Sequence, residues 1–176
     1  MKPGQSIGIK GPFPKTPYKE NQYEHVGMIA GGSGLTPMYQ VIQHALSLPN
    51  DKTKITFLFS NVSEADILMR ETLDAWAQKH PDRLKIVYAL DKGSDKWTGA
   101  TGYVSKEMIQ KYLPAPSDKV QILICGPPGQ VKSVAGAKDG MKQGELGGAL
   151  KELGYTQEQV RRRHMVQAKM LTTLQN

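Results

Sequence analysis

The residues best suited to chemistry in this sequence begin with the stretch VGMIAGGSGLTP, residues 26–37. Its five mostly apolar residues run into the turn GGSG at 31–34, and Thr36 and Pro37 then start a helical pattern. Glycines let the backbone approach a ligand closely, and the amides at a helix N-terminus carry a partial positive charge. The stretch therefore predicts a cradle for a phosphate group, although a tight turn without a ligand would use the same residues.

Three further groups of polar or reactive residues each follow an apolar, strand-like segment. Asn61 follows KITFLFS and precedes Asp66, Asp91 follows LKIVYAL, and Cys125 ends VQILIC at the start of CGPPG. The carboxyl ends of parallel strands meet at one edge of a sheet, and open α/β sheets bind their ligands there. The coincidence of all these groups at one edge predicts a binding site.

Each group also has a purely structural explanation. The glycine turn departs from the dinucleotide pattern GxGxxG because Pro37 stands where its third glycine would be. Ser63 can cap a helix, Asp91 can form a turn, and Cys125 can pack as a small buried hydrophobe. No nucleophile has its own base nearby in sequence, and no histidine lies at metal-ligand spacing from another ligand, so hydrolysis and a metal site are not expected.

Secondary-structure elements must position these groups, and the sequence shows a regular alternation of strand and helix patterns. Apolar spacing and capping residues predict the elements. The strands are expected at 26–30, 54–60, 84–90 and 120–125, and the helices at 37–48, from Ser63 to Pro81, at 105–113, at 146–153 and at 156–160. Thr36 is the expected N-cap of the first helix. This order indicates parallel pairing through right-handed crossovers, and hence a doubly wound, Rossmann-like α/β sheet.

Length and charge divide the chain into three parts. Its 176 residues suit one domain, expected at 26–160. Residues 1–25 are rich in Pro, Gly and Lys and hold one short strand pattern. Residues 161–176 supply four of the net seven positive charges and no acid, which predicts a mobile basic tail. Binding of nucleic acid would rest on this tail alone and is not favoured. No apolar run reaches the roughly 18 residues that span a bilayer.

Several motifs together identify a family. In order along the chain they are PGQSIGIKGPFPK, GMIAGGSGLTPMYQVI, FSNVSEADIL, the loop with Asp91 and Trp97, GYVSKEMI and ICGPPG. On these motifs the chain resembles the NAD-binding half of the ferredoxin-reductase-like flavoproteins, in particular the NADH-cytochrome b5 reductases of fungal mitochondrial type. The resemblance implies NADH and FAD as cofactors and cytochrome b5 as partner. A monomer in the mitochondrial outer membrane or intermembrane space is also expected, although this sequence shows no anchor.

The resemblance also implies roles for individual residues. The glycine turn would hold the NADH pyrophosphate, with Thr36 approaching the flavin. Asn61 and Asp66 would lie beside the adenosine, and Asp91 would repel a 2′-phosphate and so select NADH over NADPH. Cys125 would position the nicotinamide, and Thr36 and Cys125 are the expected catalytic residues. The full set of cofactor-binding residues is expected to be Gly31, Gly32, Ser33, Gly34, Thr36, Pro37, Asn61, Asp66, Asp91, Tyr103, Cys125, Gly126, Pro127 and Pro128.

The chain departs from the family at both ends and at one internal position. The flavin-domain signature Arg-x-Tyr-Ser/Thr-x-x-Ser is absent from the sequence, so residues 1–25 would be the last strand of a flavin domain plus a linker. The basic tail replaces the terminal aromatic residue of the family, and Gln130 stands where Met is common. Two functions are therefore predicted: a reductase that passes hydride from NADH to FAD and electrons to cytochrome b5, or a catalytically silent NADH-binding module.

Overall fold

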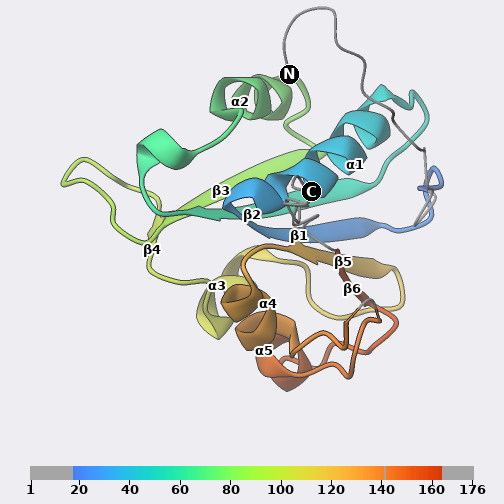
Figure 1. Ribbon diagram of the computed structural model, residues 1–176. Coiled ribbons are helices and arrows are strands. Elements are labelled where there is room, and N and C mark those ends of the chain that lie inside the picture. The colour runs from blue at the N-terminus through green and yellow to red at the C-terminus, as the bar shows by residue number, and fades with distance from the viewer. Residues whose placement is uncertain (1–17, 141, 164–176) are drawn as a thin grey trace, which may run out of the picture.

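The computed structural model describes residues 18–140 and 142–163, which form one six-stranded sheet in the order β4-β3-β2-β1-β5-β6 (Figure 1). Every neighbouring pair of strands is parallel. In chain order the elements are β1 (His25–Gly31), the 3-10 turn η1 (Gly32–Gly34), α1 (Leu35–Ser47), β2 (Lys54–Asn61), the 3-10 turn η2 (Glu64–Asp66), α2 (Arg70–Lys79), β3 (Leu84–Leu90), β4 (Ala100–Thr101), α3 (Lys106–Tyr112), β5 (Val120–Cys125), α4 (Pro128–Ala135), α5 (Gly148–Glu152) and β6 (Val160–Arg162).

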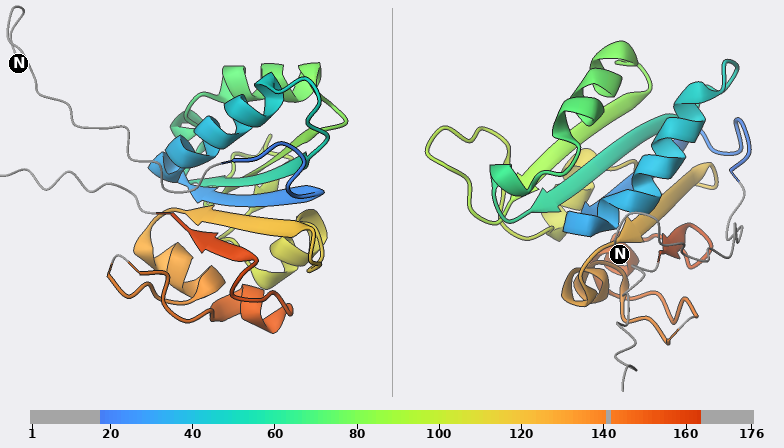
Figure 2. Two further views of the ribbon diagram at one scale, coloured as in Figure 1. Left: turned by 90° about the vertical axis from the view of Figure 1, so that its right-hand side faces the viewer. Right: turned by 45° about the horizontal axis from the view of Figure 1, so that its top comes forward.

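Helices cover both faces of the sheet. Figure 2 shows α1 and α2 on one face and α3, α4 and α5 on the other. Each face has its own apolar cluster, one built around Phe57 and Phe59 and the other around Leu58 and Ile122. Strand β2 is buried along its length after Lys54, as its nearly continuous apolar sequence predicts. The predicted doubly wound α/β fold is therefore confirmed.

The strand order places a topological switch point between β1 and β5. From β1 the chain builds outward through β2, β3 and β4, and then returns to add β5 and β6 on the other side of β1. Helices that follow β1 and β5 consequently leave on opposite faces, and a crevice opens between the two strand ends. The glycine turn and CGPPG lie at this crevice.

Two predicted helix starts are wrong. Helix α1 begins at Leu35 with Gly34 as its N-cap, because η1 runs directly into it, so Thr36 lies inside the first turn. Ser63 and Asp66 form a capping box, but it closes only the turn η2. Met69 then adopts a left-handed conformation with φ of 57°, and α2 begins at Arg70. The left-handed residue breaks the single helix that the apolar spacing predicts.

The region after β5 differs most from the prediction. Helix α4 was not expected, since CGPPG suggests a loop, yet Pro128 occupies the first helical position, where no amide donor is needed. The helix predicted at 156–160 is a turn, in which the Gln159 side chain accepts a hydrogen bond from the Thr156 amide at 2.8 Å. Strand β6 starts directly afterwards at Val160.

The first residues of the predicted basic tail belong to the domain. Arg161 and Arg162 are in β6, and Arg162 is only 1% exposed, so the boundary expected at 160 is wrong for these residues. Main-chain oxygens of the neighbouring loop, and not solvent, surround the two terminal nitrogens of the Arg162 guanidinium, while its Nε is buried with no partner among the described residues. The guanidinium donates hydrogen bonds to the carbonyls of Ala135, Gly136, Ala137, Gly144 and Glu145 at 2.9 to 3.3 Å.

The remaining predictions for the ends of the chain fall on residues 1–17 and 164–176, outside the described residues. The first described segment is tied to the domain by Asp51, whose carboxylate accepts hydrogen bonds from the Tyr18 hydroxyl at 2.5 Å and the Asn21 amide at 3.1 Å. Among the described residues, no helix is both long enough and apolar enough to cross a bilayer.

Candidate functional site

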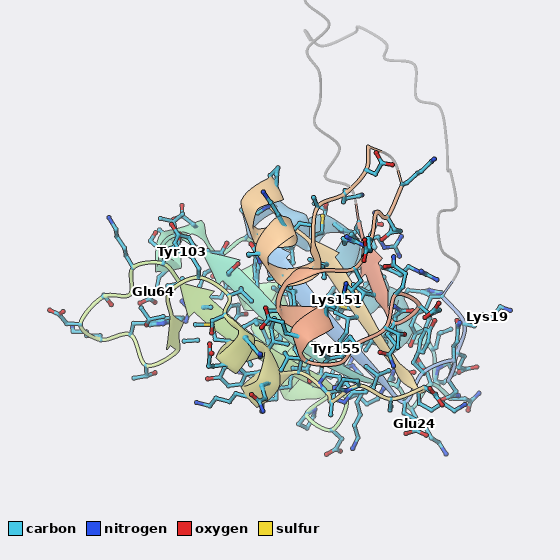
Figure 3. The ribbon with its side chains drawn as sticks, turned by 90° about the horizontal axis from the view of Figure 1, so that it is seen from below. Lys19, Glu24, Glu64, Tyr103, Lys151 and Tyr155 are labelled. Carbon is cyan, nitrogen blue, oxygen red and sulfur yellow. The ribbon has the colours of Figure 1, made fainter. Side chains whose placement is uncertain are left out.

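A cleft of about 760 Å³ opens at the carboxyl ends of the central strands, a volume within the range of roughly 300–1,000 Å³ that holds small molecules and cofactors. Figure 3 shows Tyr103 and Glu64 at this end of the molecule, with Lys19 and Glu24 at the opposite end. The cleft joins residues from four separate strand ends, as predicted. The predicted site residues that line it are Gly31, Gly32, Asn61, Asp66, Asp91, Tyr103 and Pro127.

Close packing at the switch point explains the glycines of the turn. A Cβ atom on Gly34 would overlap the carbonyl oxygen of Cys125, and one on Gly31 would overlap the side-chain oxygen of Gln130. Gly32 has open space around it but a φ of +50°, which favours glycine for conformational reasons. The turn therefore brings its backbone against the end of β5, and its amides lie beside the cleft.

Two amide side chains in the cleft wall have hydrogen-bonding atoms without partners. Asn61 is 6% exposed, and neither its side-chain oxygen nor its nitrogen has a partner among the described residues. The side-chain nitrogen of Gln130 is likewise buried and unpaired within the described part of the chain. A buried polar group without a partner costs about 1–3 kcal/mol, so such groups call for an explanation. A polar ligand in the cleft would supply one.

The two ends of the cleft differ in charge. The glycine turn after β1 and the first turn of α4 after β5 line one end together with Gln130, and the N-termini of α1 and α4 give this end a partial positive charge. Asp66 and Asp91 line the other end. The Asp66 carboxylate is held in place by the Ser63 amide at 3.0 Å and the Ser63 hydroxyl at 2.7 Å. An anionic group on a ligand is therefore favoured at the glycine end and disfavoured near the two aspartates.

The other predicted residues do not line the cleft. Cys125 is fully buried, and burial raises the pKa of its thiol, so the side chain is neutral at pH 7 and not a ready nucleophile. Thr36 is exposed on the first turn of α1, where its hydroxyl donates to the Ser33 carbonyl at 3.3 Å. Their catalytic roles stay predictions. The predicted site residues that do not line the cleft are Ser33, Gly34, Thr36, Pro37, Cys125, Gly126 and Pro128.

Sequence reasoning missed several residues that line the cleft. Most come from α4 or from the segment before α3, and Gln130 and Ser133 are on α4, which was not predicted. The signal that was available is a proline followed by Val131, Val134 and Ala135 at helical spacing. The missed residues are Ser60, Val62, Val104, Ser105, Gly129, Gln130 and Ser133.

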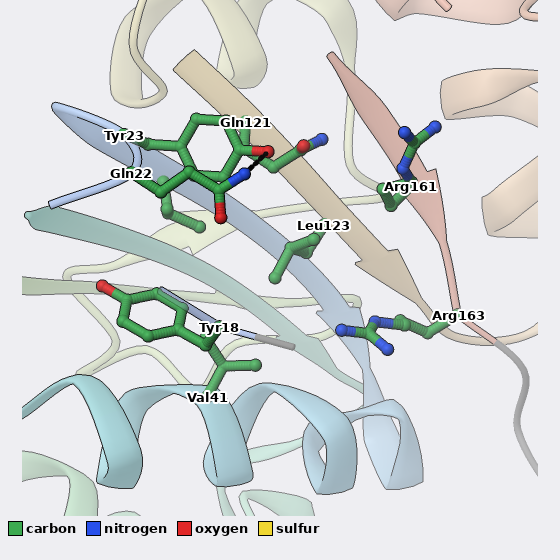
Figure 4. Close-up of a pocket in the computed structure, with 9 residues that line it drawn as sticks. Tyr18, Gln22, Tyr23, Val41, Gln121, Leu123, Arg161 and Arg163 are labelled. Carbon is green, nitrogen blue, oxygen red and sulfur yellow. Dashed lines mark hydrogen bonds between the residues drawn. The ribbon is translucent and has the colours of Figure 1, made fainter. Parts of the chain in front are cut away.

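A second hollow lies between α1, β5 and β6. Figure 4 shows it lined by Tyr18 and Tyr23 from the first described segment and by Arg161 and Arg163 at the other side. Its volume is about 50 Å³, too small for a dinucleotide. The larger cleft is therefore the candidate site.

Comparison with known proteins identifies the domain. The family described as oxidoreductase NAD-binding domain matches residues 28–136, which run from β1 to the end of α4 and contain every strand end of the cleft. The chain belongs to this family. The cleft that the geometry selects is thus part of an oxidoreductase NAD-binding domain.

Similar proteins confirm the predicted resemblance to the NADH-cytochrome b5 reductases. NADH-cytochrome b5 reductase 2 of Mycosarcoma maydis is 53% identical over 164 residues, covering 91% of this chain and 46% of that protein. The protein of the same name from Coccidioides immitis is 49% identical over 162 residues, covering 91% and 50%. The chain therefore spans about half the length of the curated relatives it matches.

Solved structures agree with this assignment. The cytochrome b5 reductase domain of Ulva prolifera nitrate reductase is 31% identical with a TM-score of 0.75, covering 91% of this chain and 63% of that one. The CS-b5R domains of human Ncb5or, in the NAD+ form, share the fold with a TM-score of 0.66 at 23% identity, covering 84% and 39%. The NAD-binding domain is thus of the ferredoxin-reductase type.

Proposed function

We propose that this chain is the NADH-binding part of a flavoprotein reductase that passes hydride from NADH to FAD and then electrons to cytochrome b5. The observation that carries the proposal is the large cleft at the switch point, with a glycine turn at one end and the unpaired, buried Asn61 in its wall. The names of the similar proteins support the same chemistry. A mitochondrial location is proposed on the sequence resemblance alone.

The residues of the cleft fit a dinucleotide. Backbone amides of the glycine turn would hold the pyrophosphate, since three of its four residues carry no side chain of their own. Asn61 would hydrogen-bond the adenosine half, relieving its two unpaired atoms, and the ring of Tyr103, which is 83% exposed, would cover the base. The turn Gly126 to Pro128 would guide the nicotinamide half, and Cys125 beneath it would contribute packing and exclude water.

Bound NADH supplies the hydride, so the chemistry belongs to the cofactor and the protein supplies orientation. Thr36 would face the flavin from the first turn of α1, where its exposed hydroxyl is fixed by Ser33. The edge of the domain around Thr36 is the part of this chain that would contact FAD. The remaining contacts to FAD are proposed to come from the part of the relatives that this chain does not match.

A second candidate is an NADH-binding module that transfers no electrons by itself, since the described residues offer FAD a single edge of the domain. We expect that the purified chain, mixed with FAD and desalted, retains little flavin absorbance, because a single edge cannot hold the cofactor tightly. Binding of NADH, followed by fluorescence titration, should persist in the same sample. Yellow protein with one flavin per chain would overturn the expectation and favour the complete reductase.

Asp91 is expected to set the preference for NADH. The Asp91→Asn variant removes the charge that would repel a 2′-phosphate at the aspartate end of the cleft, at similar side-chain size. The ratio of NADPH to NADH dissociation constants should fall by about tenfold, the size expected from one charge at short range. Titration of both nucleotides measures it. The Asp95→Asn variant, changed at an exposed residue of the following loop that does not line the cleft, is the control, and an unchanged ratio in Asp91→Asn would remove Asp91 from this role.

A further inference from the structure

Gln130 occupies the centre of the crevice between β1 and β5. It is the third residue of α4, and its side-chain oxygen lies so close to Gly31 and Gly126 that a Cβ atom on either glycine would crowd it. The side chain therefore fills the space that the two glycines leave. It also lines the large cleft, at the end where the backbone amides gather.

Ser60 lies beside the oxygen of the Gln130 side-chain amide. The Ser60 hydroxyl lies 3.0 Å from the carbonyl of Ala30 and 3.3 Å from the side-chain oxygen of Gln130, and its single proton is shared between these two acceptors. This contact occupies the amide oxygen. The amide nitrogen is left buried with no partner among the described residues. A glutamine held by one atom in this way has a single donor group available for a ligand.

We propose that the side-chain nitrogen of Gln130 donates a hydrogen bond to the pyrophosphate of the bound dinucleotide, a role that rests on the proposed function. The ligand's anionic group is favoured at the glycine end of the cleft, beside Gln130, and disfavoured near Asp66 and Asp91. Hydrogen bonds to charged acceptors are stronger than those to neutral ones, and a phosphate oxygen would satisfy the unpaired donor. Asn61, also unpaired, serves the uncharged adenosine half of the same ligand.

The test compares ligands that contain or lack the pyrophosphate. Gln130→Met keeps the length of the side chain but removes the donor, and Gln110→Met makes the same change at an exposed residue of α3 outside the cleft. NADH is titrated by its fluorescence, and ADP-ribose and adenosine compete against it. Gln130→Met should weaken NADH and ADP-ribose alike, by about tenfold, while adenosine changes less than twofold. Gln110→Met should change none of them.

A variant that adds a negative charge at residue 130 provides a second test of the pyrophosphate contact. Gln130→Glu should weaken ADP-ribose more than Gln130→Met does, because a carboxylate would face the phosphates. Unchanged ADP-ribose binding in Gln130→Met, or loss of NADH affinity alone, would overturn the assignment to the pyrophosphate. Equal loss of adenosine affinity would show that Gln130 only shapes the cleft. Failure of the unmodified chain to bind NADH would count against the proposed function itself, so the two failures are distinguishable.

Discussion

Replacement of Gly34 by alanine is expected to destabilise the protein by about 3 kcal/mol and to remove most of its NADH affinity. The added methyl group would overlap the carbonyl oxygen of Cys125 and come within 3.0 Å of the Gly126 nitrogen. These are backbone atoms at the end of a central strand, which cannot rotate away as a side chain could. Either the glycine turn or the end of β5 must shift, and both border the cleft. Urea unfolding and NADH titration measure the two effects.

Gly129→Ala is the matched control for this prediction. Gly129 lines the cleft itself, but a Cβ atom there would meet nothing within 4 Å. It lies in the first turn of α4, where alanine favours the helix, so the control should be as stable as the original chain or slightly more stable. Destabilisation of Gly34→Ala by less than 1 kcal/mol would show that the end of β5 shifts easily. The close approach of the Gly34 backbone to β5 would then not be important for stability.

Replacement of Arg162 by methionine is expected to cost about 3 kcal/mol in the free energy of unfolding. Methionine retains much of the volume but leaves without donors the carbonyls that the guanidinium now satisfies around residues 135–137 and 144–145. Burial lowers the pKa of Arg162, which shows that its charge is itself costly there, so the hydrogen bonds must offset that cost. Urea unfolding monitored by circular dichroism measures the change.

Arg161→Met provides the comparison on the same strand. Arg161 faces the other side of β6, beside the small hollow, and no hydrogen bond of its side chain to the described residues is known. Its replacement should change stability by less than about 0.5 kcal/mol. An Arg162→Met variant as stable as the original chain would mean that the desolvated charge costs as much as its hydrogen bonds contribute.

Local pattern was sufficient for most of the fold. The strands β2, β3 and β5 were predicted within one residue, because each is a short apolar run bounded by polar or turn residues. The parallel order followed from the alternation with helices, and the meeting of strand ends followed from the parallel order. Asn61, Asp66 and Asp91 could therefore be placed at one edge from the sequence.

Elements that depend on their surroundings were harder to predict. Helix α4 begins at the second of two prolines and has only a short apolar spacing, and β6 ends in arginines, so the local signal of each element is weak. The Arg162 side chain is buried only because carbonyls from a loop some 17 to 27 positions earlier converge on it. No spacing rule within the strand contains that information, and composition alone favours a solvated tail.

For this protein the sequence by itself determined four of the six strands, their carboxyl ends and the glycine turn between β1 and α1, since these depend on residues close together along the chain. Only the tertiary structure decided that Gly34 meets the Cys125 carbonyl, that Cys125 is covered, and that Gln130 holds an unpaired donor in the cleft wall. These contacts join segments up to about a hundred positions apart, and their distances are set by how the helices pack on the sheet.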